Sequence, residues 1–324
     1  MLLKVFLLCV YSSFYLCSSM GRTLIPQKNV SVSAVFVFGD SFVDQGNNNY
    51  INTLGKGNFL PYGKDFQGGK PTGRFSNGKT LPDLLVEAFG VKDYLPASLD
   101  PLIKDKDLQT GVSFASGGSG FDPLTTAETS AIPMSVQLDM FKQHILKLKR
   151  NIKEEAADNI IDNSVAVIVA VLNFIQEIYR LGVRRIAVFS APPIGCLPVV
   201  RTLDGGPHRK CADKENNAAQ LFNSFLTQQV QLWATSYPQS RVGVIDYYNP
   251  LISIIENPHK YGFDVADRGC CGTGEIEVLF LCNKLTPTCP NDSKYFFWDG
   301  FHLTEKGNSI ILYHILQDLL NSLF

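Results

Sequence analysis

Near the start of the chain stands Val35-Phe36-Val37-Phe38-Gly39-Asp40-Ser41-Phe42. Four apolar residues in a row, two of them valines, predict a strand that is buried on both faces. Gly39 ends this strand, so Asp40 and Ser41 fall where a parallel strand passes into a loop or helix. In open α/β sheets, ligands bind at this edge, outside the carboxyl ends of the strands.

Two interpretations of Ser41 follow from this stretch. In the first, its hydroxyl is a nucleophile, and nearby backbone N–H groups stabilise the negative charge that develops in the reaction. In the second, the serine only caps a helix in an ordinary strand-to-helix turn. Gly-Asp-Ser by itself favours the second interpretation, so the rest of the chain has to decide between them.

Size and charge limit the classes of function. The chain has 324 residues, 45% of them hydrophobic, and a formal net charge of −1. This size fits one large domain, which we place at residues 30–324. A nucleic-acid surface requires clustered Lys and Arg. The one basic run, residues 142–150, is interleaved with Ile145, Leu146 and Leu148 as in an amphipathic helix, so no nucleic-acid partner is predicted.

Residues 1–19 are predicted to be a secretory signal peptide. Lys4 precedes an apolar run, and the small residues Ser18 and Ser19 follow it. The run is too short for a membrane span, and no later run is long and apolar enough to cross a bilayer. We therefore expect a secreted, extracellular monomer without an integral membrane span.

Six cysteines lie beyond the predicted signal peptide: Cys196, Cys211, Cys270, Cys271, Cys282 and Cys289. An even number in an exported chain predicts disulfides. The first two bracket a loop rich in Pro and Gly and are expected to pair, whereas the pairing of the other four is left open. A zinc site is the alternative, but no Cys-x-x-Cys is present. Sequons at Asn29 and Asn291 predict a glycoprotein.

Predicted strands and helices alternate along the chain. Further strands are expected at 111–115, 164–172, 185–190 and 242–246, and helices at 81–89, 135–157, 174–181, 212–235 and 303–320. This alternation predicts an α/β fold, with a mainly parallel sheet between two layers of helices. The cysteine-rich segment 269–290 is predicted to be irregular. The glycine-rich turn at 117–120 lacks the spacing of a phosphate or dinucleotide loop, and no cofactor is predicted.

An aspartate stands three residues before a histidine, just ahead of the last predicted helix. On a turn, the carboxylate of Asp299 can accept a hydrogen bond from Nδ1 of His302, which leaves Nε2 free to take a proton from a serine. Ser-His-Asp chemistry requires these roles and no fixed order along the chain. The other histidines, in helices or loops, are more typical of packed or solvated side chains.

Five motifs are spread over nearly the whole mature chain: Phe38-Gly39-Asp40-Ser41-Phe42-Val43-Asp44 with Gly46-Asn47-Asn48-Asn49, Gly73-Arg74-Phe75-Ser76-Asn77-Gly78, Phe114-Ala115-Ser116-Gly117-Gly118-Ser119-Gly120, Pro192-Pro193-Ile194-Gly195-Cys196-Leu197-Pro198, and Asp299-x-x-His302. With this set, the chain resembles the plant GDSL esterases/lipases of the SGNH-hydrolase superfamily, and is similar to their extracellular-lipase subgroup. This resemblance implies an SGNH/flavodoxin-like hydrolase fold and the hydrolysis of acyl esters or lipids.

The resemblance also implies roles for individual residues. Ser41 would be the nucleophile, His302 the general base and Asp299 the partner that orients it. The oxyanion hole would take the backbone N–H of Ser41 and one glycine N–H, which could come from Gly117 or Gly118; we favour Gly118. No metal or cofactor is implied.

One part of the family pattern is altered. The family has Gly-x-Asn-Asp after the third strand, and its asparagine is a further oxyanion donor. Here Asn173 stands at that position, but Val171 and Phe174 replace the glycine and the aspartate, and a stretch of the pattern is missing after it. Asn173 either donates to the oxyanion or caps the helix that follows, and the second interpretation is favoured.

These observations leave three hypotheses of different classes. The first is a secreted serine ester hydrolase that works through an acyl-enzyme intermediate. The second is a catalytically weak or inactive protein of the same fold with a binding role, as the altered third block would allow. The third is a truncated product that does not fold stably.

Overall fold

The computed structural model describes residues 31–120, 123–169, 172–274, 276 and 281–324, apart from the side chains of residues 123, 172 and 173. The predicted signal peptide at 1–19 and the sequon at Asn29 lie outside the described residues. Within the described part of the chain, the structure contains no helix with the length and apolar character of a membrane span.

Four parallel strands pair in the order β1-β2-β3-β4. Their bounds are Val35–Phe38, Val165–Ile168, Arg185–Phe189 and Arg241–Ile245. The register places Val35 beside Val165 in the first pair of strands. Gly39 follows β1 with a φ of +145°, and a Cβ there would lie 2.9 Å from the Cβ of Val169, so glycine lets β1 end close against β2.

The strand predicted at 111–115 is an irregular segment in which Ser113 forms isolated bridges to Val37 and to Ala97. The Val37 N–H donates to the Val112 carbonyl, and the Phe114 N–H donates to the Val37 carbonyl, on the side of β1 away from β2. The amide of Asn47 donates to the carbonyls of Ser113 and Ala115. The Ser98 N–H also donates to the Ser113 carbonyl, whereas the Ala115 carbonyl accepts from the Asn47 side chain. Backbone pairing is therefore limited to isolated bridges around Ser113.

Because this segment and β2 flank β1 on opposite sides, the direction of strand order reverses at β1. In doubly wound sheets the crevice at such a reversal point, outside the carboxyl ends of the strands, is where ligands bind. Ser41 follows β1 at this edge.

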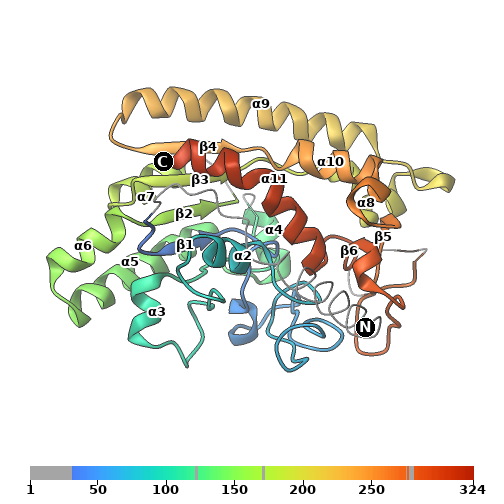
Figure 1. Ribbon diagram of the computed structural model, residues 1–324, viewed down its shortest axis with the longest axis horizontal. Helices are drawn as coiled ribbons and strands as arrows, with labels where there is room; N and C mark the ends of the chain where they lie inside the picture. The colour runs from blue at the N-terminus through green and yellow to red at the C-terminus, as the bar shows by residue number, and fades with distance from the viewer. Residues whose placement is uncertain (1–30, 121–122, 170–171, 275, 277–280) are drawn as a thin grey trace, which may run out of the picture. The chain divides into compact units, whose positions relative to one another are not determined.

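Helices cover both faces of the sheet, as predicted (Figure 1). Phe36, Phe38 and Ile168 face one layer of helices, and the alternate residues Val35 and Val37 are buried on the opposite face. The first layer contains α5 (Met134–Asn151), α6 (Glu154–Asp162), α7 (Leu172–Arg180) and α9 (Asp213–Ser236). On the other side of the sheet, α11 (Glu305–Leu323) contacts β3, β4 and α2 (Leu81–Ala88).

Shorter elements connect these layers. The remaining α-helices are α3 (Asp105–Thr110), α4 (Pro123–Thr129), α8 (Pro198–Leu203) and α10 (Tyr248–Glu256). The 3-10 turns are η1 (Asn47–Tyr50), η2 (Ile194–Cys196), η3 (Gly206–His208), η4 (Pro258–Tyr261) and η5 (Asp292–Lys294). None of these elements was predicted from the sequence.

Two predicted elements differ from the structure in extent. The helix expected at 135–157 is two helices, because Ile152 and Lys153 between α5 and α6 have extended ψ angles of 171° and 141°. The strand expected at 164–172 ends at Ile168, and α7 already begins at Leu172. An apolar run does not distinguish a buried strand from the start of a buried helix.

The cysteine-rich segment is tied together by disulfides and a small sheet. Cys196–Cys211 forms as predicted, and the other four cysteines pair as Cys270–Cys289 and Cys271–Cys282. The segment is flanked by two strands that pair in parallel, β5 (Val265–Gly269) and β6 (Tyr295–Phe297), which the sequence did not indicate.

This small sheet leads into the turn with Asp299 and His302. The Cys271 N–H donates to the Trp298 carbonyl at 2.7 Å, and the Trp298 N–H donates to the His302 carbonyl at 2.7 Å. Thr304 then caps α11 by accepting from the Gly307 N–H. Disulfides, β6 and the start of α11 therefore fix the turn from three sides.

Candidate active site

Ser41, His302 and Asp299 meet at the carboxyl edge of the sheet. The Ser41 Oγ lies 2.7 Å from the His302 Nε2, and the His302 Nδ1 lies 2.8 Å from the Asp299 Oδ2. An ionised carboxylate only accepts hydrogen bonds, so we assign the imidazole proton to Nδ1 and leave Nε2 as the acceptor for the serine hydroxyl. The structure thus brings together the three residues that the sequence singled out.

Asp299 is buried and accepts several hydrogen bonds. Its Oδ1 accepts from the backbone N–H groups of Phe301 and His302, each at 2.8 Å. Burial by itself would raise the pKa of Asp299, but the charge of His302 and these hydrogen bonds outweigh it and hold that pKa below its ordinary value. The carboxylate therefore stays ionised beside the imidazole.

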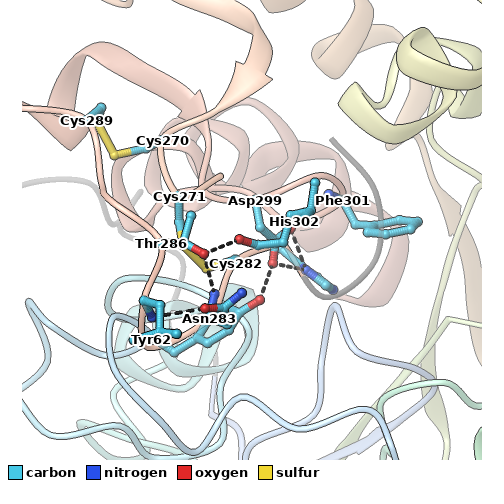
Figure 2. Close-up of a disulfide and its surroundings, with 12 residues drawn as sticks. Tyr62, Cys270, Cys271, Cys282, Asn283, Thr286, Cys289, Asp299, Phe301 and His302 are labelled. Atoms are coloured by element: carbon cyan, nitrogen blue, oxygen red, sulfur yellow. Dashed lines mark hydrogen bonds and ion pairs between the residues drawn. A yellow bond between two sulfur atoms is a disulfide. The ribbon is translucent and has the colours of Figure 1, made fainter. Parts of the chain in front are cut away.

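Tyr62 is a fourth member of this network, and it was not predicted from the sequence. Its hydroxyl donates to the Asp299 Oδ2 at 2.8 Å (Figure 2). Burial, together with the Asp299 charge, raises the pKa of Tyr62 well above its ordinary value, so the hydroxyl keeps its proton as a donor. The sequence around Tyr62 gives only a weak indication of this role, because Leu60-Pro61-Tyr62-Gly63 predicts no more than a turn.

Aromatic rings hold the imidazole in place. The Phe75 ring stacks on His302 with centroids 5.0 Å apart and an interplanar angle of 27°, and Phe42 lies 5.4 Å away at 54°. Tyr62 packs edge-on against Phe75. A ring held by packing on its faces and by Asp299 at Nδ1 keeps Nε2 directed at Ser41.

The two candidate glycines of the oxyanion hole have different hydrogen bonds. The Gly117 N–H donates to the Asp44 Oδ2 at 2.9 Å and is therefore occupied. The N–H groups of Ser41 and Gly118 donate to no acceptor in the described part of the chain. Gly118 has a φ of +88°, in the region that favours glycine. This arrangement supports Gly118 over Gly117 as the donor.

A set of buried side chains fixes the glycine-rich turn. Asp44 accepts from the backbone N–H groups of Gly46 and Asn47 through Oδ1 and from Gly117 through Oδ2. The Asn48 amide donates to the Gly117 carbonyl at 2.7 Å, and its Oδ1 accepts from the Ser116 hydroxyl. The loop after Ser41 thus positions the segment that carries Gly118.

Asn173 does not stand at the cap position that was expected for it. Because α7 begins at Leu172, its backbone lies in the first turn of the helix and not ahead of it. Its side chain lies outside the described residues, so its predicted contribution to the oxyanion hole stays a prediction. The expectation of a helix starting at residue 174 was wrong. The apolar run that contains β2 extends to Leu172, and its pattern does not show where the strand ends and the helix begins.

Comparison with known proteins identifies the family. The family model for GDSL-like lipase/acylhydrolases matches residues 35–315. The chain belongs to this family. It is 42% identical to the GDSL esterase/lipase EXL3 of Arabidopsis thaliana, over 97% of this chain and 94% of the relative, and 43% identical to the GDSL esterase/lipase At5g42170 of the same plant, over 94% and 90%. This membership places the chain among the carboxylic ester hydrolases and confirms the resemblance to the plant proteins.

The alignments also bear on the missing stretch. The alignment with EXL3 extends over 345 positions, although this chain has only 324 residues. The relative therefore has residues within the aligned region that this chain lacks. A stretch missing after Asn173, as predicted from the sequence, would produce a difference of this kind.

Replacement of Asp44 by asparagine tests the buried carboxylate. Asp44 is fully buried, and burial raises its pKa to about 6, against hydrogen bonds from Gly117, Gly46 and Asn47. A raised pKa in the folded state disfavours the charged form, so the contribution of Asp44 to stability is greatest below about pH 4 and declines as the pH rises through about 6. We expect the wild type to lose roughly 2–3 kcal/mol relative to Asp44→Asn between pH 4 and pH 7.

The measurement is the free energy of unfolding in urea for both proteins at pH 4, 5, 6 and 7. A difference between the two proteins that does not change with pH would contradict the raised pKa of Asp44.

Replacement of Tyr62 by phenylalanine tests the fourth member of the network. Without the hydroxyl, the Asp299 carboxylate accepts one hydrogen bond fewer. More of its negative charge then acts on His302 and stabilises the imidazolium form. We expect kcat to fall by about 3- to 30-fold and the acid limb of the pH–rate profile to move to higher pH. Tyr261→Phe is the matched control, because its hydroxyl bonds to Ser253. An unaltered pH profile in Tyr62→Phe would rule out this role.

Proposed function

We propose that the protein hydrolyses acyl esters through a catalytic triad of Ser41, His302 and Asp299. The observation that carries the proposal is the continuous chain of hydrogen bonds from Ser41 Oγ through the imidazole to Asp299, with distances of 2.7 Å and 2.8 Å. Membership of the GDSL-like lipase/acylhydrolase family supports it. The chemistry requires no metal or cofactor, because the three side chains supply the nucleophile, the base and the charge that stabilises the imidazolium.

In the first half of the reaction, Ser41 Oγ attacks the ester carbonyl while its proton moves to His302 Nε2. The carbonyl oxygen becomes an oxyanion and accepts hydrogen bonds from the backbone N–H groups of Ser41 and Gly118. The tetrahedral intermediate collapses, the bond to the alcohol oxygen breaks, and the imidazolium gives its proton to that oxygen. The products are the free alcohol and an acyl group bound to Ser41.

In the second half, water replaces the alcohol. His302 Nε2 takes a proton from the water as the water oxygen attacks the acyl carbonyl, and the same two N–H groups stabilise the second oxyanion. The imidazolium then returns its proton to Ser41 Oγ, and the carboxylic acid leaves. Throughout, the ionised Asp299 stabilises the imidazolium and keeps the Nδ1–H tautomer.

Replacement of Ser41 by alanine tests the triad. We expect the hydrolysis of short-chain p-nitrophenyl esters to fall by more than about 10⁴-fold, because the nucleophile is lost while the fold is kept. Ser236→Ala, on the exposed side of α9, is the control and should retain full activity. A fluorophosphonate probe should label the wild type and fail to label Ser41→Ala. Equal hydrolysis by both proteins would refute the proposal.

The altered third block predicts a lower catalytic rate than in a family member with a complete block. A family member with a complete block has an asparagine donor in addition to the two N–H groups, and the loss of one oxyanion donor typically costs about 10²–10³ in rate. Here Val171 and Phe174 replace its neighbours, and the helix starts at Leu172. We propose that the hole consists of the Ser41 and Gly118 donors.

Replacement of Asn173 by alanine decides this point. We expect kcat to change by less than about threefold, because the hole already lacks the third donor. The measurement is kcat for p-nitrophenyl acetate in the wild type and the variant. A 100-fold loss would instead assign the third donor to Asn173.

We also propose that the protein is secreted and acts as a monomer. Three disulfides among the described residues support an oxidising compartment, and the predicted signal peptide at 1–19 is consistent with export. The Asn291 side chain of the second sequon lies on the exposed surface, where a glycan could attach.

A further inference from the structure

A fully buried glutamine binds the backbone just ahead of Ser41. Gln137 lies near the start of α5, and its side chain has no contact with solvent. Its Oε1 accepts a hydrogen bond from the Gly39 N–H at 2.9 Å, and its Nε2 donates to the Gly39 carbonyl at 2.9 Å. One amide therefore binds both backbone polar groups of the residue that follows β1.

This amide takes the place of a backbone partner at the end of β1. Val37 pairs through its N–H and its carbonyl with the segment 112–114. The Gly39 carbonyl continues this pairing, since it also accepts from the Ser116 N–H at 3.1 Å. The Gly39 N–H, however, donates to Gln137. A side chain from the helix layer thus completes the pairing of the strand that leads to the nucleophile.

The same amide reaches the glycine-rich turn. The Gln137 Nε2 also donates to the Ser119 Oγ at 3.2 Å. Ser119 is buried and directly follows Gly118, whereas Gly39 precedes Ser41 by two residues. The Gln137 side chain is therefore bonded to both segments that carry the proposed oxyanion donors.

The hydrogen bonds determine which way the amide lies. The Nε2 faces two carbonyl oxygens, of Gly39 at 2.9 Å and of Ile132 at 3.1 Å, and the Oε1 faces an N–H group. A flipped amide would place oxygen against oxygen and N–H against N–H. Such contacts are costly in the interior, where water cannot compensate them. The Gln137 amide therefore has one orientation, which its partners require.

Helix α5 gives this side chain a fixed support. Phe141 lies one turn after Gln137 on the same side of the helix. Its ring packs on those of Phe36 and Phe38 of β1, with centroids 4.9 Å and 5.4 Å apart. The core packing of Phe141 holds α5 against β1, so the position of the Gln137 amide relative to that strand is set by a rigid contact.

An oxyanion hole requires a defined distance between its donors. Two N–H groups stabilise the transition state together only when both lie at hydrogen-bond distance from the same oxygen. The proposed donors of Ser41 and Gly118 belong to segments that are distant in the sequence. Asp44 holds the residue before Gly118, and Gln137 binds the residue after it.

We propose that Gln137 is a positioning residue whose amide sets the spacing between the two oxyanion donors, the N–H groups of Ser41 and Gly118. The inference rests on the proposed function, since it takes these two groups as the donors. It assigns a role in the reaction to a residue of the helix layer that touches neither the substrate nor the triad.

The test compares p-nitrophenyl acetate with its thionoester analogue, in which sulfur replaces the carbonyl oxygen. Both release the same leaving group, but sulfur accepts hydrogen bonds weakly, so the thionoester gains less from the oxyanion donors. The ratio of kcat/KM for the ester to kcat/KM for the thionoester therefore reports on the hole. We expect Gln137→Met to lower this ratio at least about fivefold. Gln143→Met, at an exposed position of the same helix, should leave it unchanged.

A purely structural role predicts a different result. Partial unfolding of Gln137→Met removes active protein and lowers both rates by the same factor, so the ratio stays constant. A constant ratio overturns the inference. Should Gln137→Met fail to fold, Ser119→Ala decides, because it removes only the link to the glycine-rich turn. It should lower the ratio at least about twofold, and the exposed Ser135→Ala should not. A constant ratio in Ser119→Ala is then the contradicting result.

Hydrogen exchange separates this inference from the proposed function, because it requires no turnover. In Gln137→Met, amide exchange in residues 39–42 and 116–120 should accelerate at least about tenfold more than exchange in β3. The measurement is mass spectrometry of peptides from these regions. Acceleration in only one of the two segments, or equal acceleration in β3, overturns the coupling even where Ser41-dependent hydrolysis is established. Selective acceleration in both segments without Ser41-dependent hydrolysis overturns the mechanism and keeps the coupling.

Discussion

The hydrogen bond between Ser41 and His302 joins residues that lie 261 positions apart. Its two ends are supported separately. Ser41 follows β1, which is paired on both sides and buried, and His302 stands on a turn between β6 and α11 that two disulfides brace. A shift of about 1 Å in either support would break the geometry, so the rigidity of both elements is a condition for the proposed chemistry.

The loop after Ser41 uses buried polar groups where a sheet would use strand pairing. The side chains of Asp44, Asn47 and Asn48 bind backbone groups of the neighbouring segment and fix its glycine-rich turn. Such a network is rigid when every group is satisfied, and an unpaired buried group is costly. The same residues that resemble a family motif therefore have a structural role, namely to hold the proposed oxyanion donor Gly118 in place.

Much of the sheet could be predicted from local pattern. The apolar runs at 35–38 and 185–190 mark strands because parallel strands are buried on both faces. Where a run also fits a helix, the prediction failed: β2 ends at Ile168, and α7 takes the residues from Leu172 onward. The pair β5 and β6 left no signal, because short strands beside cysteines are held by cross-links and have no long apolar run.

The sequence by itself determined the candidates Ser41, Asp299 and His302, because each lies in a short motif whose residue types carry the chemistry. Only the tertiary structure decided that Gly117 is engaged by Asp44, that Tyr62 donates to Asp299, and how the last four cysteines pair. The reason is that hydrogen bonds and cross-links between distant segments depend on which groups become neighbours in space. Spacing along the chain does not encode that proximity.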